Sequence, residues 1–244
     1  MYSPPAPKPK PPARLKTGIE GFDSIIEGGF LPERVYLVCG PPGAGKTTFA
    51  VHFLTEGCKK GEIGLYVSLI ESPINIVKDM ARYRNMQVPQ FVRDKKLHFL
   101  DVGATICQYT TEPPTSAQIF DAIKKRVDSL KVRRLVIDGI DAIKFSSADE
   151  VQKTKQVSMF IRGLEGLGCT TLLIGNLTEP DRYTIEQFLA HGVIFLHNFL
   201  HGGQMTRAIQ VVKMRGTKHD CNMRKITFTD AGIKVFSTEF TPPG

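Results

Sequence analysis

Eight consecutive residues in the first quarter of the chain have the types and the spacing that phosphate binding requires. They read Gly40-Pro-Pro-Gly-Ala-Gly-Lys-Thr47 and match the pattern G-x-x-x-x-G-K-[ST]. Their glycines let backbone N–H groups converge on phosphate oxygens, and the helix predicted to begin at Lys46 points its positive dipole end at the anion. We expect Lys46 to reach the β- and γ-phosphates of a nucleotide, and the Thr47 hydroxyl to help bind Mg²⁺. The expected nucleotide contacts are Gly40, Pro41, Pro42, Gly43, Ala44, Gly45, Lys46, Thr47 and Thr48.

Two carboxylates stand where strands are predicted to end. Residues 134–137 are predicted as an apolar strand that ends at Asp138, and we expect this carboxylate to bind Mg²⁺ together with Thr47. Glu71 directly follows residues 66–70, and ligands of open α/β sheets bind at the carboxyl ends of the strands. Glu71 is therefore the candidate general base for the attacking water, with a solvated strand end as the alternative.

The frame that positions these side chains is predicted from short β-branched runs that alternate with helical patterns. Ser72 is expected to cap the helix that begins at Pro73. The pattern predicts an α/β fold, a mostly parallel twisted sheet with helices on both faces and antiparallel C-terminal strands. The expected strands are 35–39, 64–69, 97–100, 134–137, 170–174, 192–200, 207–214, 225–229 and 233–236. The expected helices begin at 46 and 73 or lie near 117–130, 149–167 and 185–190.

Length and composition fit one globular domain. The chain has 244 residues, of which 41% are hydrophobic, and a chain of this length buries a core without disulfide or metal staples. Residues 1–13 are rich in proline and lysine and are predicted to be a disordered tail, while residues 14–244 form a single domain. The longest nearly apolar run, residues 192–200, is shorter than the roughly 20 residues that cross a bilayer. We therefore expect no membrane span.

Charge and cysteine content favour a cytoplasmic protein without a strong affinity for nucleic acid. The 32 Lys+Arg and 24 Asp+Glu give a net charge of +8, but Lys8, Lys10, Arg14 and Lys16 contribute half of it from one acid-free stretch. The five cysteines are odd in number and widely spaced, as expected of reduced thiols. Residues 1–16 carry no apolar segment of a secretory signal, so we expect a cytoplasmic location.

Further segments resemble a known family. Together with the phosphate-binding loop, the segments 17–23, 28–29, 71–73, 136–138 and 206–219 resemble the KaiC-like branch of the RecA superfamily of P-loop ATPases. The most discriminating stretch is Lys213-Met-Arg-Gly-Thr-Lys-His219, and the resemblance extends over residues 14–240. It implies a RecA-type P-loop NTPase core, Mg-ATP bound between neighbouring subunits, and a homo-oligomeric ring that is commonly a hexamer.

The resemblance also implies roles for basic residues near the C-terminus. Lys213 and Arg215 are two apart on a predicted strand and therefore share one face. In the family such residues approach the γ-phosphate of the nucleotide held by the adjacent subunit, like an arginine finger in trans. The alternative is a solvated basic strand edge. By the same resemblance, the further residues expected around the neighbour's nucleotide are Thr217, His219, Thr229 and Asp230.

One departure from the family pattern affects catalysis. The family has two consecutive glutamates before Thr-Pro, with the first favoured as general base, whereas this chain reads Ile70-Glu71-Ser72-Pro73. Isoleucine cannot deprotonate water, and loss of a catalytic base costs about 10²–10⁴-fold in rate. The resemblance therefore implies an ATPase whose hydrolysis is slow. One two-domain member of the family, a circadian clock protein, autophosphorylates a Ser-Thr pair in its second domain. The matching positions here read Gln187-Phe188, which cannot accept phosphate.

Two alternative functions stay open. The first is a non-catalytic, ATP-gated scaffold or signalling module that acts on an unidentified protein partner, and the missing first glutamate favours it. The second is a recombinase-like ATPase that binds DNA, which rests on analogy with RecA relatives alone.

Overall fold

The computed structural model describes residues 13–103, 114–143, 150–176, 184–201 and 203–239. Residues 1–12, nearly all of the predicted disordered tail, lie outside these ranges. Within the described ranges, no helix is both long and apolar enough to cross a membrane.

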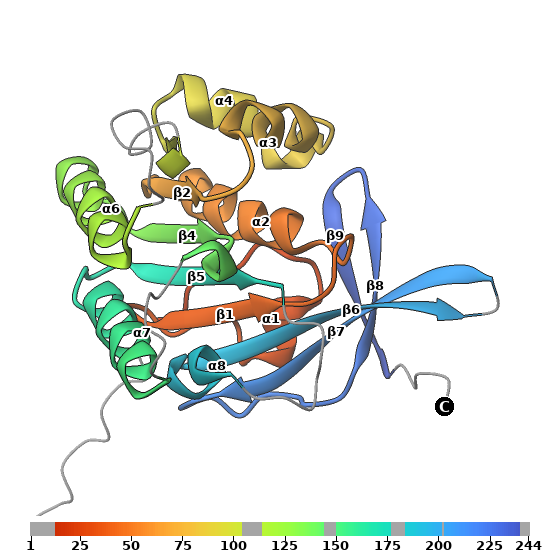
Figure 1. Cartoon of the computed structure of the whole chain (residues 1–244). Helices are drawn as coiled ribbons and strands as arrows, with labels where there is room; N and C mark the ends of the chain where they lie inside the picture. The colour runs from red at the N-terminus through yellow and green to blue at the C-terminus, as the bar shows by residue number, and fades with distance from the viewer. Residues whose placement is uncertain (1–12, 104–113, 144–149, 177–183, 202, 240–244) are drawn as a thin grey trace, which may run out of the picture.

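A single sheet contains the strands of the described residues, in the order β3-β2-β4-β5-β1-β6-β7-β8-β9 (Figure 1). The strands from β3 to β6 in this order run parallel, whereas β7, β8 and β9 are each antiparallel to the strand before. The predicted α/β fold class, with antiparallel strands at the C-terminal end, is confirmed. The strands are β1 (Val35–Cys39), β2 (Gly64–Ser68), β3 (Leu97–Asp101), β4 (Arg134–Asp138), β5 (Thr170–Gly175), β6 (Gly192–His201), β7 (Gln204–Met214), β8 (Arg224–Thr229) and β9 (Gly232–Glu239).

The five helices predicted from the sequence are present as α2, α3, α6, α7 and α8. Ser72 stands at the N-cap of α3, but its side chain accepts no capping hydrogen bond from the described backbone, so the expected side-chain cap is wrong. The helices are α1 (Phe22–Ile25), α2 (Lys46–Lys59), α3 (Pro73–Met80), α4 (Val88–Arg93), α6 (Ser116–Leu130), α7 (Glu150–Glu165) and α8 (Ile185–Leu189). The described residues also contain two 3₁₀ turns, η1 (Arg84–Met86) and η2 (Ile140–Ala142).

The core has two parts, one on each face of the sheet. Because successive strand residues point to opposite faces, Tyr66 and Val136 pack in the cluster that contains α2, while Val67 and Ile137 pack in the cluster that contains α6 and α7. Asp138 follows Val136 by two residues and therefore lies on the α2 face. The helix that follows the phosphate-binding loop thus covers the sheet face on which Asp138 lies.

The parallel register brings the ends of β1, β2 and β4 to one edge of the sheet. Asp138 pairs with Ser68 of β2 on one side and with Ile174 of β5 on the other. Ile174 also pairs with Val38, one residue before the end of β1. The chain leaves β1 for the phosphate-binding loop at this edge, and the loop therefore emerges level with Asp138.

Candidate nucleotide site

The phosphate-binding loop, residues 40–45, joins β1 to α2 in a conformation that depends on glycine. Gly45, the N-cap of α2, has a φ of 104°, which L side chains rarely adopt. At Gly40 a Cβ atom would lie 2.1 Å from the Leu196 carbonyl oxygen of β6, so a side chain has no room there. Lys46 bends back over the loop, and its Nζ donates to the carbonyl oxygens of Gly40 at 2.7 Å and Pro41 at 3.0 Å. The loop backbone and the Lys46 ammonium therefore face one another, as an anion site requires.

Asp138 lies beside the residues at the start of α2. Burial raises the pKa of its carboxyl group, and the Tyr66 hydroxyl, the Lys46 ammonium and the Thr47 hydroxyl each oppose that rise. The Tyr66 hydroxyl donates a hydrogen bond to Asp138 Oδ2. Partial burial lowers the pKa of Lys46, and the charge of Asp138 opposes that shift. The structure thus brings Lys46, Thr47 and Asp138 together, although they are up to 92 residues apart in sequence.

The oxygen donors at this position suit Mg²⁺. Magnesium prefers oxygen ligands and is held in proteins by one or two carboxylates, together with phosphate oxygens and water. A largely buried carboxylate with a raised pKa next to a hydroxyl is stabilised by a divalent cation. Among the described residues, no cluster of three or more His, Cys, Asp and Glu could hold a metal ion by itself. Asp138 and Thr47 therefore fit a cation whose other ligands come from a nucleotide and from water.

The segment after β2 arranges Ile70 and Glu71 differently from the prediction. The strand ends at Ser68, one residue before the end of the predicted strand 64–69, and the Ser68 hydroxyl donates to the backbone carbonyl of Glu71. Glu71 is largely exposed. The part of its carboxylate that is buried and the nearby carboxylates of Asp79 and Asp138 raise the pKa of its side chain. Ile70 lies against Gly139, where a Cβ atom would be 2.8 Å from Ile70 Cδ1. Ile70 thus contacts the residue that directly follows Asp138, and Glu71 is close enough for its charge to be affected by Asp138.

Asp141 has a structural role that differs from that of Asp138. It lies in η2 with an exposed side chain, and its Oδ2 accepts a hydrogen bond from the backbone N–H of Asn176 at 2.6 Å. This contact ties the turn after β4 to the end of β5, consistent with the role of a capping or surface residue.

Three residues of the C-terminal strands reach the phosphate-binding loop without having been predicted. Arg207 of β7 donates from Nε to the Gly43 carbonyl oxygen at 2.8 Å, and Asn198 of β6 donates from Nδ2 to Pro42 at 3.4 Å. The Arg207 guanidinium carbon lies 5.1 Å from the centre of the Phe228 ring. Phe228 lines one side of a hollow of about 290 Å³, whose remaining lining residues are Gly43, Gly45, Lys46, Thr47 and Thr48.

This hollow also locates two residues expected at the neighbour's nucleotide. Thr229 and Asp230 directly follow Phe228, and both are exposed at the turn between β8 and β9. The Thr229 hydroxyl lies 3.2 Å from the carbonyl oxygen of Gly232. Their position after Phe228 puts both residues on the side of this chain's own phosphate-binding loop.

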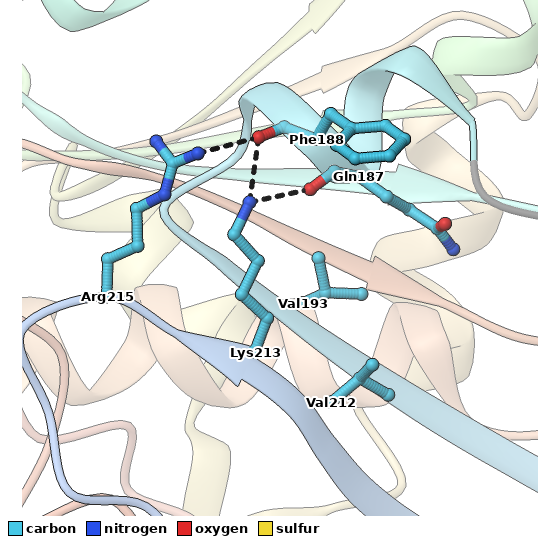
Figure 2. A pocket seen from close by; sticks show the side chains of 6 residues that line it. All are labelled: Gln187, Phe188, Val193, Val212, Lys213 and Arg215. Carbon is cyan, nitrogen blue, oxygen red and sulfur yellow. Dashed lines mark hydrogen bonds between the residues drawn. The ribbon is translucent and has the colours of Figure 1, made fainter.

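Lys213 and Arg215 extend toward the same point at the end of α8 (Figure 2). Lys213 Nζ donates to the carbonyl oxygens of Gln187 and Phe188, both at 2.8 Å, and Arg215 Nη2 donates to Phe188 at 2.9 Å. Burial and the charge of Arg215 lower the pKa of Lys213. The pair lines a pocket of about 350 Å³, whose other lining residues are Gln187, Phe188, Val193 and Val212.

This pair lies at the opposite edge of the sheet from the phosphate-binding loop. The backbone N–H of Arg215 donates to His191, and that of His191 donates to Val35 at the start of β1. The loop begins at Gly40, five residues along the strand, which at about 3.3 Å per residue is roughly 16 Å away. Lys213 and Arg215 therefore lie far from the phosphates of this chain's own site.

Thr217 and His219 follow the pair in a loop held by the N-terminal segment. The Thr217 hydroxyl accepts a hydrogen bond from Arg14 Nη1 at 3.0 Å, and Arg14 Nη2 pairs with Glu27 at 2.7 Å. His219 Nδ1 lies 3.3 Å from the Thr217 carbonyl oxygen. Both residues are partly buried, so this loop is held against the rest of the chain.

Similarity to known proteins covers most of the chain. A family model described as "ATPase: KaiC" matches residues 15–239. The circadian clock oscillator protein KaiC of Parasynechococcus marenigrum is 31% identical over 230 residues, which cover 91% of this chain but only 44% of that protein. A UPF0273 protein of Thermotoga maritima is 30% identical, covering 93% of this chain and 97% of that protein. The crystal structure of a KaiC-like protein from Pyrococcus horikoshii OT3 matches with a TM-score of 0.79 and 30% identity, covering 93% of this chain and 100% of that one.

Proposed function

Because this chain belongs to the KaiC family of ATPases, we propose that it binds ATP together with Mg²⁺ and hydrolyses the nucleotide slowly. The observation that carries the proposal is the meeting of Lys46, Thr47 and Asp138 at one edge of the sheet. A phosphate-binding loop without a nearby carboxylate would suit any phosphate ligand. The carboxylate beside Thr47 favours a nucleotide bound with a divalent cation.

Each residue of the site has one role in this proposal. Lys46 and the loop N–H groups bind the β- and γ-phosphates, while Thr47 and Asp138 hold the cation. The bound Mg²⁺ supplies neutralisation of phosphate charge. Glu71 orients a water molecule and accepts its proton as the water oxygen bonds to the γ-phosphorus. The bond from that phosphorus to the bridging oxygen breaks, and ADP and phosphate result.

Slow hydrolysis follows from the side chain at position 70. Ile70 packs against Gly139, the residue after Asp138: a Cβ atom at Gly139 would lie 2.8 Å from Ile70 Cδ1, nearer than the Leu69 Cβ atom at 3.7 Å. A base at position 70 is absent, and Glu71 is the remaining candidate, with an exposed carboxylate whose pKa is raised by partial burial and by the charges of Asp79 and Asp138. We therefore assign turnover to Glu71 and expect it to be weak.

The position of Lys213 and Arg215 supports action on a neighbouring subunit. These cations lie roughly 16 Å from the loop of their own chain, measured along β1. In a homo-oligomeric ring, which we propose to be a hexamer, they would approach the γ-phosphate at the next subunit's site. The described cysteines Cys39, Cys58, Cys169 and Cys221 are free thiols, which supports a cytoplasmic location.

The same observation at position 70 favours one second function. If Glu71 does not act as a base, the chain is a nucleotide-gated scaffold, in which bound ATP stabilises the ring and a protein partner reads the assembly. Binding without turnover separates this function from the first.

Steady-state ATP hydrolysis with Mg²⁺ tests the proposal. Wild type and Lys46→Ala are compared at concentrations where light scattering defines the oligomer. Turnover above that of Lys46→Ala supports the ATPase, and tight ATP binding without such turnover supports the scaffold. If wild type and Lys46→Ala bind ATP equally weakly, the proposed nucleotide site is wrong.

A further inference from the structure

Tyr66 is a buried side chain whose hydroxyl ends inside the candidate cation site. It lies in the middle of β2 and is fully buried. Its hydroxyl donates to Asp138 Oδ2, and the Thr47 hydroxyl lies near enough to lower the pKa of the phenol. Tyr66 therefore contacts one of the two residues that we assign to Mg²⁺ and lies near the other.

The surrounding packing fixes the direction of this phenol. Its ring stacks on Phe99 of β3, with the centroids 5.6 Å apart and an angle of 29° between the planes. Tyr66 belongs to the core cluster that contains α2, and it is two residues before Ser68, the partner of Asp138 in the strand register. A ring held between β3 and α2 keeps its hydroxyl at one place, next to the end of β4.

The phenol can act only as a hydrogen-bond donor toward the carboxylate. A phenol ordinarily loses its proton only at about pH 10, so at neutral pH the Tyr66 hydroxyl carries a proton that it can donate. An ionised carboxylate only accepts hydrogen bonds. The hydrogen bond between the two side chains therefore has one direction, from the Tyr66 hydroxyl to Asp138 Oδ2.

We propose that Tyr66 is a positioning residue that orients the Asp138 carboxylate for Mg²⁺. The phenol holds one carboxylate oxygen and leaves the other for the cation, so the carboxylate does not have to be ordered when Mg-ATP binds. This inference rests on the proposed Mg-ATP site, and it adds a residue that acts through Asp138 without touching the nucleotide.

Tyr36 provides a matched control for a purely structural role. It is a buried tyrosine of β1, 1% exposed, and it lies in the same core cluster. Its hydroxyl donates to the backbone carbonyl oxygen of Leu31 at 2.9 Å, and within the described part of the chain no hydrogen bond joins it to a residue assigned to the site. Tyr36→Phe and Tyr66→Phe each remove one buried hydroxyl, but only Tyr66→Phe frees the Asp138 carboxylate.

The test measures how the binding of a fluorescent ATP analogue depends on Mg²⁺ concentration. A hydrogen bond to a charged group contributes about 1.5 kcal/mol or more, so Tyr66→Phe should raise the Mg²⁺ concentration for half-maximal binding about tenfold. Binding of the analogue in EDTA should stay as in wild type. Tyr36→Phe should leave the Mg²⁺ dependence unchanged, even if its melting temperature falls as much as that of Tyr66→Phe.

A spectroscopic measurement gives a second, independent readout. The chain has no tryptophan and six tyrosines, so its near-ultraviolet absorption comes mainly from tyrosine. Adding Mg²⁺ to the protein already mixed with ATP should produce a tyrosine difference spectrum in wild type and in Tyr36→Phe. The spectrum should be absent from Tyr66→Phe.

The outcomes separate this inference from the proposed function. If wild type binds the analogue no better than Lys46→Ala, or shows no Mg²⁺ dependence, the proposed Mg-ATP site fails. If wild type shows that dependence and both Tyr→Phe variants share it unchanged, or both lose it equally, only the role of Tyr66 is overturned. A wild-type protein without a tyrosine difference spectrum also overturns that role.

Discussion

If the proposed function is right, replacing Ile70 by glutamate should raise the rate of ATP hydrolysis. Ile70 lies against Gly139, the residue after Asp138, and 69% of its side chain is exposed. The replacement therefore removes an exposed apolar group and buries no new charge. Its effect on the free energy of unfolding should stay within about 0.5 kcal/mol.

The expected gain follows from what a general base contributes. A positioned base supplies about 10²–10⁴-fold in rate, or about 2.7–5.4 kcal/mol in activation free energy at about 1.36 kcal/mol per factor of ten. Because Glu71 already supplies part of this, we expect kcat to rise about 10²-fold. The carboxylates of Glu71 and Asp138 should raise the pKa of the new glutamate, as Asp138 does for Glu71. A base works when deprotonated, so kcat should rise with pH through that raised pKa and then level off.

The assay compares kcat of wild type, Ile70→Glu and Ile70→Gln at saturating Mg-ATP, with the oligomer checked by light scattering. Ile70→Gln has nearly the same shape as the glutamate variant but cannot accept the proton, so it should keep the wild-type rate. If Ile70→Glu and Ile70→Gln turn over ATP equally while their ATP affinities match wild type, the assignment of slow hydrolysis to position 70 is refuted.

Three further predictions concern other parts of the molecule. Arg215→Ala should lower turnover about 10³-fold while the fold stays intact. Mixing this variant with Lys46→Ala subunits, which keep Arg215, should restore part of the rate. A mixture that recovers no activity argues against action of Arg215 on a neighbouring subunit. Arg207→Ala removes the hydrogen bond to Gly43 and should weaken ATP binding about fivefold by calorimetry, whereas an unchanged affinity would show that the contact does not hold the loop. Burial lowers the pKa of His52 to about 4. The neutral imidazole therefore adds to the free energy of unfolding above pH 6.5, and this stabilisation is lost as the pH falls toward 4. Urea unfolding should show a loss of about 3 kcal/mol over that window, absent from His52→Gln.

The parts of the site that lie within one stretch of sequence were predictable, and the parts that depend on strand order were not. The loop from Gly40 to Thr47 carries its own chemistry, and the apolar run before Asp138 marks a strand end. The contact of Tyr66 with Asp138 needs β2 to lie beside β4, which the alternation of strands and helices does not specify. Local secondary-structure propensity does not indicate which strand will lie beside which in the sheet.

The contact of Arg207 with Gly43 is an even longer-range case. The two residues are 164 apart in the chain. They meet only because the register of β7 against β6 pairs Arg207 with Asn198. Ser72 shows the reverse limit, because a residue of the right type at the N-cap position of α3 makes no side-chain cap. Residue type indicates what a side chain can do, and only the surrounding backbone decides whether it does so.

Strand β7 connects the phosphate-binding loop with the pocket at the end of α8. Arg207 holds the phosphate-binding loop of its own subunit, and six residues later Lys213 holds the end of α8 at the opposite edge of the sheet. Both side chains extend from β7, which pairs with β6 along this stretch with one register shift beside Val193 and Ile194. One strand therefore links the contact at Gly43 and the contact at the end of α8 through a single continuous piece of backbone.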